Sequence, residues 1–335
     1  MTRLKIAGAA IIALMVIALA LEERSAVDQS GDQSLFPDLA EQLVSLDRVL
    51  VSGPDHSVEL VRSDNIWRVA ERYDYPANFE QLSGLLDQLS RAKLIERKTA
   101  RVESHDSLDV VVGPQSRGHR VDFPGLDLEP LIVGRTATLR SGTFVRLGEE
   151  AQVWLADRTV EITADPALWL ESQILTIPES QILGMAALDG QGAALFDVNR
   201  DPASGDLSLA NLPEGRTLRY GTALTPNFTV IGQLQLLDVA RRVPKRWEGA
   251  PSRVYRLVDG RTLTVQTAAD GGEFWIKVQL GQDDERVASL DGTDVFVKIT
   301  AVQQENFDFK VSQRTFTDLT ADLEQFLKPL EEPAQ

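Results

Sequence analysis

The 335-residue sequence contains no cysteine. This absence excludes disulfides, thiolate zinc sites, iron–sulfur clusters, cysteine nucleophiles and a lipidated cysteine. Histidine is almost as scarce, because the chain has only three. No H-x-x-x-H or H-x-H spacing occurs, whereas a zinc site needs three or four converging ligands. We therefore expect His56, His105 and His119 to be solvated loop residues, and we expect neither a metal nor another cofactor.

The familiar catalytic motifs are also missing. The chain has no G-x-S-x-G elbow and no G-x-x-x-x-G-K-[ST] phosphate loop. ATP hydrolysis would therefore belong to a partner. No residue is predicted to be catalytic, cofactor-binding or metal-binding, and we expect a protein that is not an enzyme. An envelope hydrolase with an active site assembled from distant residues remains an alternative.

Basic residues are few relative to acidic ones, and the net charge is −16. Without Arg3 and Lys5, which precede an apolar run, 32 basic residues face 50 acidic ones, a net charge of −18. No basic stripe is apparent to offset this charge. Nucleic acid and anionic lipid are therefore poor partners for the body of the protein.

Beyond Glu22-Glu23, acidic residues adjoin one another at three places, which raises the question of paired catalytic carboxylates. Glycosidase acids face each other across a cleft in contrasting environments, whereas neighbours on a solvated loop do not. We therefore attribute these acids to solubility and turn formation: Glu149-Glu150, Asp283-Asp284-Glu285 and Glu331-Glu332. Weak calcium binding by Asp283–Glu285 or by Asp189 lacks the twelve-residue loop pattern.

Long hydrophobic runs are absent except at the N-terminus, where residues 6–21 form 16 consecutive apolar residues. Arg3 and Lys5 precede this run, and Glu22-Glu23-Arg24 follow it. Cations before the run orient the N-terminus toward the cytoplasm and the body outward. The sequence therefore predicts a body outside the cytoplasm, with residues 22–34 as a polar tether.

The fate of this leader has more than one interpretation. A retained single-pass anchor is favoured, although a spanning helix usually needs about 20 residues. A cleaved signal peptide is the rival, because Ala18-Leu19-Ala20 fits a small-x-small cleavage site. A buried soluble helix is the third interpretation. The first places the protein in the inner membrane with its body in the periplasm.

The body shows alternating strands and one Leu-rich helix in its first half, residues 35–178. A short helix is expected over residues 37–46, and Asn78 is expected to cap the main helix. Phe79, Leu82, Leu85, Leu86 and Leu89 would form its buried face. Pro166 would open a short helix capped by Asp165. Strands are expected at 48–51, 57–62, 66–70, 131–133, 143–147 and 152–155.

The second half, residues 179–330, repeats this order of elements. Thr225-Pro226 is expected to open a helix with Phe228, Ile231, Leu234, Leu237 and Ala240 on its buried face. A last helix is expected to use Phe316, Leu319, Leu323, Phe326 and Leu327. Strands are expected at 181–188, 193–197, 208–210, 253–257, 262–266 and 274–280. The repeated order predicts an internal duplication: two related α+β half-domains, each an antiparallel sheet packed against one main helix.

The five tryptophans are the most informative aromatic residues. Trp67, Trp154 and Trp275 lie on predicted strands, and Trp169 lies on a predicted short helix. We expect these rings to fill the cores between sheets and helices, with a stacking platform for glycans as the alternative. Trp247 follows three polar or cyclic residues, so we expect it to be the most exposed.

Several short segments, in this order, resemble the bacterial domain-of-unknown-function family 4340. The resemblance is strong over the first half and rests on general layout in the second. A leucine-glycine pair common in the family is replaced here by Ser107-Leu108-Asp109-Val110. The matching segments are 35–39, the Trp67 strand, Tyr75-Pro76, Lys98-Thr99-Ala100, 131–135, 144–146, 153–155 and 165–170.

The resemblance implies a membrane-anchored accessory protein encoded beside ABC transporters of the gliding-motility type. It supplies no catalytic residues. We therefore expect a non-catalytic extracytoplasmic accessory component that contacts transporter permease subunits or cargo. A released solute- or glycan-binding protein is a further alternative.

Overall fold

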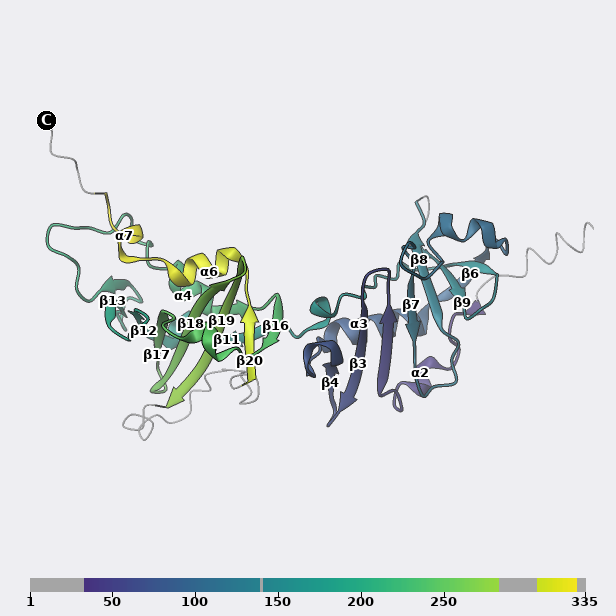
Figure 1. The fold of residues 1–335 in the computed structure, drawn as a ribbon, viewed down its shortest axis with the longest axis horizontal. Coiled ribbons are helices and arrows are strands. Elements are labelled where there is room, and N and C mark those ends of the chain that lie inside the picture. Colours follow the sequence, from purple (N-terminus) through teal and green to yellow (C-terminus); the bar gives the residue numbers. More distant parts are fainter. Residues whose placement is uncertain (1–32, 139–140, 283–305, 330–335) are drawn as a thin grey trace, which may run out of the picture. The chain divides into compact units, whose positions relative to one another are not determined.

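The protein is described by a computed structural model that covers residues 33–138, 141–282 and 306–329 (Figure 1). The chain divides into two compact units, the first ending at Trp169 and the second beginning at Leu170. Each unit is built mainly from an antiparallel sheet with a few helices, which confirms the α+β class. The predicted leader lies outside the described residues. Among the residues that are described, no helix is long and apolar enough to cross a membrane.

The first unit contains a ten-stranded sheet with the order β1-β6-β10-β9-β8-β7-β2-β3-β4-β5. All of its neighbouring strands are antiparallel. Residues 33–34 belong to this sheet, although we expected them in the tether. The strands are β1 (Gln33–Ser34), β2 (Arg48–Ser52), β3 (Ser57–Ser63), β4 (Ile66–Val69), β5 (Tyr75–Pro76), β6 (Lys93–Arg97), β7 (His119–Asp122), β8 (Leu131–Thr136), β9 (Thr143–Leu147) and β10 (Val153–Ala156).

The main helix of this unit is α3 (Phe79–Arg91), and its start is set by Asn78 as predicted. The Asn78 side chain accepts a hydrogen bond of 3.0 Å from the Gln81 amide, which satisfies one free donor of the first turn. The buried face consists of Leu82, Leu85, Leu86 and Leu89. Phe79 was predicted to join that face, but it is 61% exposed, because it stands in the first turn.

Smaller helices complete the first unit. The expected helix over residues 37–46 is reduced to α2 (Leu39–Gln42), and the segment opened by Asp165-Pro166 forms the 3₁₀ helix η4 (Pro166–Trp169). The Asp165 side chain accepts from the Ala167 amide, as its predicted capping role requires. Trp169 is buried, and its carbonyl accepts from the Asn78 amide at 2.7 Å. This bond ties η4 to the start of α3. Two more 3₁₀ helices, η2 (Val102–Ser104) and η3 (Asp106–Leu108), lie between β6 and β7.

The second unit contains an eight-stranded sheet with the order β14-β13-β12-β17-β18-β19-β20-β16. Its strands are β12 (Ile182–Leu188), β13 (Ala194–Arg200), β14 (Leu207–Leu209), β16 (Asp238–Arg241), β17 (Ser252–Leu257), β18 (Arg261–Asp270), β19 (Glu273–Gln282) and β20 (Phe307–Lys310). A separate ribbon pairs β11 (Gln173–Thr176) with β15 (Gln233–Gln235). This pairing places residues 173–176 in the second unit, whereas we expected the boundary after residue 178.

The helices of the second unit differ from the prediction. The helix opened by Pro226 is α4 (Pro226–Gly232), and it ends at a glycine, a poor helix former. Leu234 and Ala240, predicted on the same helix, lie on β15 and β16, because the backbone there pairs with β11 and β20. The predicted last helix is two helices, α6 (Gln313–Thr320) and α7 (Leu323–Phe326). Helix α6 contacts β18, β19 and α4. Two helices, α4 and α6, therefore pack in the second unit where we expected one main helix.

The two sheets have corresponding strand orders. Across the sheet of the first unit, eight strands lie side by side in the order β4-β3-β2-β7-β8-β9-β10-β6. Across the sheet of the second unit, the corresponding order is β14-β13-β12-β17-β18-β19-β20-β16. In each unit a three-stranded meander is followed by a helix, α3 or α4. The chain then continues into a strand at or next to the opposite end of the sheet, β6 in the first unit and, after β15, β16 in the second. A second meander, of four strands, then fills the space in the sheet between this strand and the first meander. The helix is therefore a crossover from one end of each sheet to the other.

Candidate functional site: the cationic cluster of the second unit

The three histidines occupy three different environments. His56 is exposed in the turn between β2 and β3, as predicted. His105 is only 5% exposed, and its Nε2 lies 2.9 Å from the Ala151 carbonyl oxygen, so the prediction of a solvated residue is wrong. His119 lies on β7, where burial lowers the pKa of its imidazole. No group of three or more metal-ligating side chains comes together within the described ranges.

The acidic residues considered for chemistry are dispersed. The Glu149 side chain is 92% exposed, in keeping with a solubility role. The Asp189 carboxylate accepts hydrogen bonds from the Gln191 and Ala193 amides, both at 2.8 Å, and so stabilises its own turn. The other pairs, residues 283–285 and 331–332, lie outside the described residues.

The tryptophans give the clearest pointer to a site. Trp67, Trp169 and Trp275 are buried, which confirms their predicted core role, and Trp154 is half-buried. Trp247 was predicted to be exposed, but only 7% of it is accessible. The burial of Trp247 is explained by a hydrogen bond of its indole, which the sequence pattern alone did not reveal.

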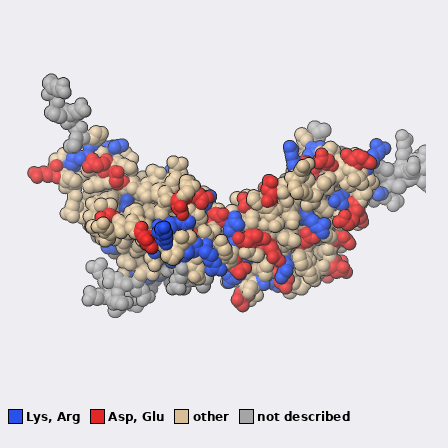
Figure 2. Space-filling view, in the orientation of Figure 1, with Lys and Arg blue, Asp and Glu red and all other residues tan. Residues whose placement is uncertain are grey.

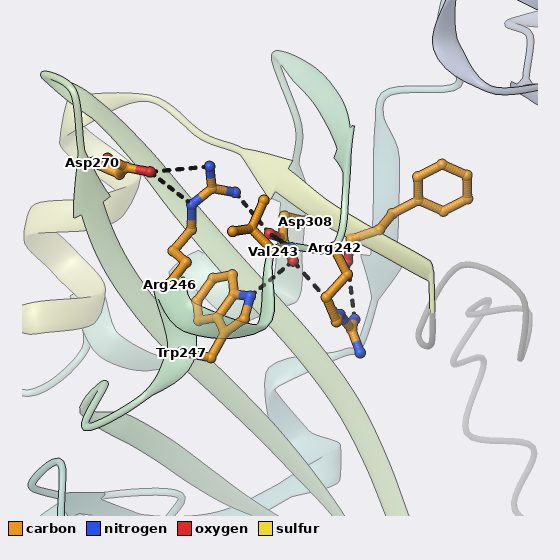
Figure 3. A network of polar contacts seen from close by, with 7 residues as sticks. Arg242, Val243, Arg246, Trp247, Asp270 and Asp308 are labelled. Atoms are coloured by element: carbon orange, nitrogen blue, oxygen red, sulfur yellow. Dashed lines mark hydrogen bonds and ion pairs between the residues drawn. The ribbon is translucent and has the colours of Figure 1, made fainter.

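That hydrogen bond runs from Trp247 Nε1 to Asp308 Oδ1 at 2.9 Å. Asp308 lies on β20 and is completely buried. Its Oδ2 accepts from Arg246 Nη1 at 2.7 Å and from the Val243 amide at 3.1 Å, and Arg242 Nε lies 3.6 Å from Oδ1 (Figure 3). Both carboxylate oxygens therefore have partners. Because its lone pairs are engaged, Asp308 anchors the surrounding cations and is poorly placed to act as a general base.

The anchored segment is the 3₁₀ helix η6 (Pro244–Trp247), which follows β16. Arg246 also donates to Asp270 Oδ2 through Nε and Nη2, each at 3.2 Å, so it bridges two carboxylates (Figure 3). Its guanidinium lies 4.4 Å from the centroid of the Trp275 ring, a cation–π geometry. These contacts hold η6 against β18, β19 and β20.

A further cation, Lys277 on β19, lies over the ring of Trp247. Its Nζ is 5.8 Å from the centroid of the Trp247 ring. Burial lowers the pKa of Lys277, and Arg242 adds to this effect, while Asp308 acts in the other direction. The lowered pKa therefore reflects chiefly the burial of the ammonium, with Arg242 as a smaller contribution.

We name Arg242, Lys245, Arg246 and Lys277 the cationic cluster. Its four positive charges exceed the two negative charges of Asp308 and Asp270 that pair with them. Lys245 is exposed, as is its acidic neighbour Glu248. Figure 2 shows Lys and Arg gathered over the region where Figure 1 places β16 and β20. The second unit thus carries a local group of basic side chains on a chain that is acidic as a whole.

Part of this cluster could have been found from the sequence. Arg241, Arg242, Lys245 and Arg246 are four basic residues within six positions of an acidic chain. The fourth member, Lys277, and the anchoring acid Asp308 are far from these residues in sequence. They come close only because β19 and β20 pair.

The first unit offers a different surface, a groove of about 850 Å³ between α2 and α3 that also contacts Trp67. Apart from Arg62 on β3, its polar side chains lie along α3, and two of them, Asp87 and Arg91, form an ion pair of 2.8 Å. They are arranged in a row along α3 and do not face one another across a cleft. This geometry suits a helix surface better than acid–base chemistry.

Comparison with known proteins gives one match. The family described as "Domain of unknown function (DUF4340)" matches residues 67–271, from the Trp67 strand to the turn after β18. No curated protein and no solved structure shows significant similarity to the chain. The family match extends well into the second unit, where we expected only a likeness of layout. Because it spans more than half of the sequence, the chain belongs to the DUF4340 family.

Proposed function

We propose that this protein is a non-catalytic, membrane-anchored extracytoplasmic accessory component of an ABC-type transport system, and that its second unit docks on a partner through the cationic cluster. The observation that carries the docking role is the buried Asp308, which fixes Arg242 and Arg246 on a strongly acidic chain. The transport system and the membrane anchor rest on the family resemblance and on the apolar leader.

The partner surface that fits this cluster is an acidic patch on a protein, either a permease subunit or cargo. Complementary charge accelerates association and suppresses partners of like charge. The remainder of the chain, with its excess of Asp and Glu, would repel such a patch and would leave the cluster as the point of contact. The orientation of docking is thereby restricted.

The two units are proposed to descend from a duplication, with each keeping the same ordered sheet and crossover helix. The support is the correspondence of strand order, since eight strands in one unit match eight in the other. Only the second unit carries Asp308 and η6, so duplication would have allowed one copy to acquire the docking role.

The location is the inner membrane, with the body in the periplasm. This part of the proposal rests on residues 1–24, where cations precede the apolar run and acids follow it. A reporter fused to the C-terminus should be active in the periplasm. Activity of the reporter in the cytosol would overturn the location and the partners together.

The docking proposal is tested by affinity purification of the tagged full chain from native membranes in mild detergent. Wild-type protein should recover transporter subunits, and recovery should fall as salt is raised, because exposed charges are screened. The Lys245→Glu variant should recover several-fold less. Lys328→Glu, which reverses an exposed charge near the end of the described chain, is the matched control.

Two results would contradict the proposal. Purification without any transporter component would remove the assigned system. Equal recovery by wild-type protein and Lys245→Glu would show that the cluster is not the contact, even if a transporter is the partner.

A released solute-binding protein is the second candidate. It is favoured by a pocket in the second unit that contains a buried arginine. Mass spectrometry of the mature N-terminus separates the two candidates, because cleavage after Ala20 would release the body from the membrane.

A further inference from the structure

Arg253 is an unusual residue in the sheet of the second unit. It lies on β17 and is only 4% exposed. Its strand neighbour Ala187 on β12 is paired in turn with Phe196 on β13. Residues directly opposite one another on adjacent strands lie on the same face, so Arg253 and Phe196 flank a small alanine. The Arg253 guanidinium lies 5.2 Å from the centroid of the Phe196 ring.

The charge of Arg253 is only partly satisfied. Its Nη2 donates to the Ala321 carbonyl, between α6 and α7, at 2.7 Å. Its Nε is buried and has no hydrogen-bond partner among the residues that the structure describes. Burial lowers the pKa of Arg253, and the neighbouring Tyr255 opposes this shift to a smaller extent. A buried guanidinium without a carboxylate partner is costly, which points to an anion that is supplied from outside.

A pocket of about 370 Å³ opens beside this guanidinium, between the sheet and the segment that joins α6 to α7. Its walls are mostly apolar and include Leu195, Phe196, Pro251 and Leu323. Leu195 is 56% exposed and stands at the surface. The volume is at the small end of ligand sites, sufficient for an apolar side chain or a short acyl chain.

Two carboxylates also line the pocket, and both have other partners. Asp322 Oδ1 accepts from the Gln325 amide at 3.1 Å and caps α7. Glu324 is held by Arg216 through contacts of 2.8 and 3.2 Å. Because these acids are committed elsewhere, they leave Arg253 available, and they disfavour ligands that carry more than one negative charge.

We propose that this pocket binds a small apolar carboxylate, with its carboxylate on Arg253 and its apolar group against Leu195, Phe196 and Leu323. Charge-assisted hydrogen bonds to a guanidinium are about twice as strong as neutral ones. Two sources offer this chemistry: a short-chain carboxylic acid and the C-terminus of a peptide that ends in an apolar residue. The site is separate from the cationic cluster and does not depend on it.

The test is isothermal titration calorimetry on the full chain held in lipid nanodiscs, so that no detergent competes for the pocket. The probes are hexanoate and a tetrapeptide, Ala-Ala-Ala-Leu with an acetylated N-terminus, each compared with its neutral amide. The acids should bind at millimolar concentration or tighter, and the amides should bind at least tenfold more weakly. Binding of hexanoate alone identifies the acyl source, and binding of the peptide alone identifies the C-terminal source. Either result supports the proposal.

Two variants and one control test the residues. Arg253→Met should weaken binding about tenfold or more, which corresponds to the loss of one hydrogen bond to a charged group. Leu195→Ser, at an exposed position that the fold does not need, should weaken binding several-fold. Leu237→Ser, which alters a leucine of similar exposure outside the pocket, should have no effect.

The overturning results are equally defined. Equal affinity for acids and amides would show that Arg253 does not receive a carboxylate. An absence of heat with every probe, or wild-type affinity in both Arg253→Met and Leu195→Ser, would also end the proposal. None of these results would bear on the docking role of the cationic cluster.

Discussion

The same stretch of the fold is anchored in two different ways in the two units. In each unit, the segment between the crossover strand and the four-stranded meander forms 3₁₀ helices that fold back on the sheet. In the first unit this segment carries His105, which bonds to the Ala151 carbonyl just before β10. In the second unit it carries Arg246 and Trp247, which bond to Asp308 on β20. The strands β10 and β20 occupy equivalent places in the two sheets. One anchor is thus a single hydrogen bond to the backbone, and the other is an ionic network.

The crossover helices differ as well. Helix α3 has 13 residues and a side-chain cap, whereas α4 has 7 residues and its N-cap residue Thr225 makes no side-chain cap bond. In the second unit α6 supplies additional cover over β18 and β19. The comparison teaches that strand order can persist while the means of stabilisation and the surface chemistry change. Four changes to the chain test this contrast.

The largest effect is expected at the ionic anchor. Asp308→Ala removes the acceptor of three hydrogen bonds and leaves Arg242 and Arg246 without their buried counter-charge. Breaking one partner of a buried ion pair costs about 3–5 kcal/mol. Urea denaturation, monitored by hydrogen exchange of β16 to β20, should show this loss in the second unit alone. A loss below about 1 kcal/mol would mean that the network contributes little. The isosteric Asp308→Asn separates charge from packing.

The histidine anchor of the first unit is expected to contribute less to stability. His105→Ala removes one buried hydrogen bond and leaves the Ala151 carbonyl without its partner, at a cost of about 1–3 kcal/mol. The loss should be confined to the first unit. If His105→Ala proved as costly as Asp308→Ala, the contrast between the two anchors would not hold. Exposed His56, changed to Ala, is the matched control.

Much of the sheet architecture was predictable, because local alternation specifies strands directly. In β2, buried Val49 and Val51 alternate with half-buried or exposed residues, and such a pattern is visible without tertiary knowledge. The cap of α3 is equally local, since Asn78 stands three residues before its partner. The α+β class and most strands of both units follow from signals of this kind.

The helix predicted from Phe228 to Ala240 failed for a physical reason. The apolar residues after Gly232 fit both helical and alternating periods, so the pattern alone could not decide. Pairing with β11 and β20 decided for strands. Leu237, expected on the buried face, is accordingly 54% exposed.

The site around Asp308 could not be predicted from the sequence, for a related reason. Trp247 lies among polar residues in the sequence, and we therefore predicted that it is exposed. In the structure its indole donates a hydrogen bond to Asp308 and is buried. Asp308 itself is an acid between two phenylalanines, and nothing nearby in sequence identifies its partners. The site depends on the pairing of β19 with β20, and such long-range contacts are not encoded in local periodicity.

A smaller effect is expected at the crossover helices. Asn78→Ala removes a side-chain cap and should cost about 1 kcal/mol, within a range of about 0.5–2 kcal/mol. Thr225→Ala removes no such bond and should change stability by less than about 0.5 kcal/mol. The free energy of unfolding of each unit, measured in parallel denaturant titrations, checks the pair. Equal losses would indicate that the two helices are capped alike in solution.

The smallest effect is a pH dependence that belongs to the first unit. Burial disfavours the imidazolium of His119, so its pKa in the folded state lies below the ordinary value of 6.5. As the pH falls through about 6.5, the unfolded chain takes up a proton that the folded chain resists, and the free energy of unfolding therefore decreases. Above that pH the contribution is fully present, and below the folded pKa it is lost. His119→Gln should flatten this part of the pH profile while His56→Gln, at an exposed site, should not. NMR titration of the His119 ring measures the folded pKa directly, and a value at or above 6.5 would show that β7 does not shield the ring from water as the fold requires.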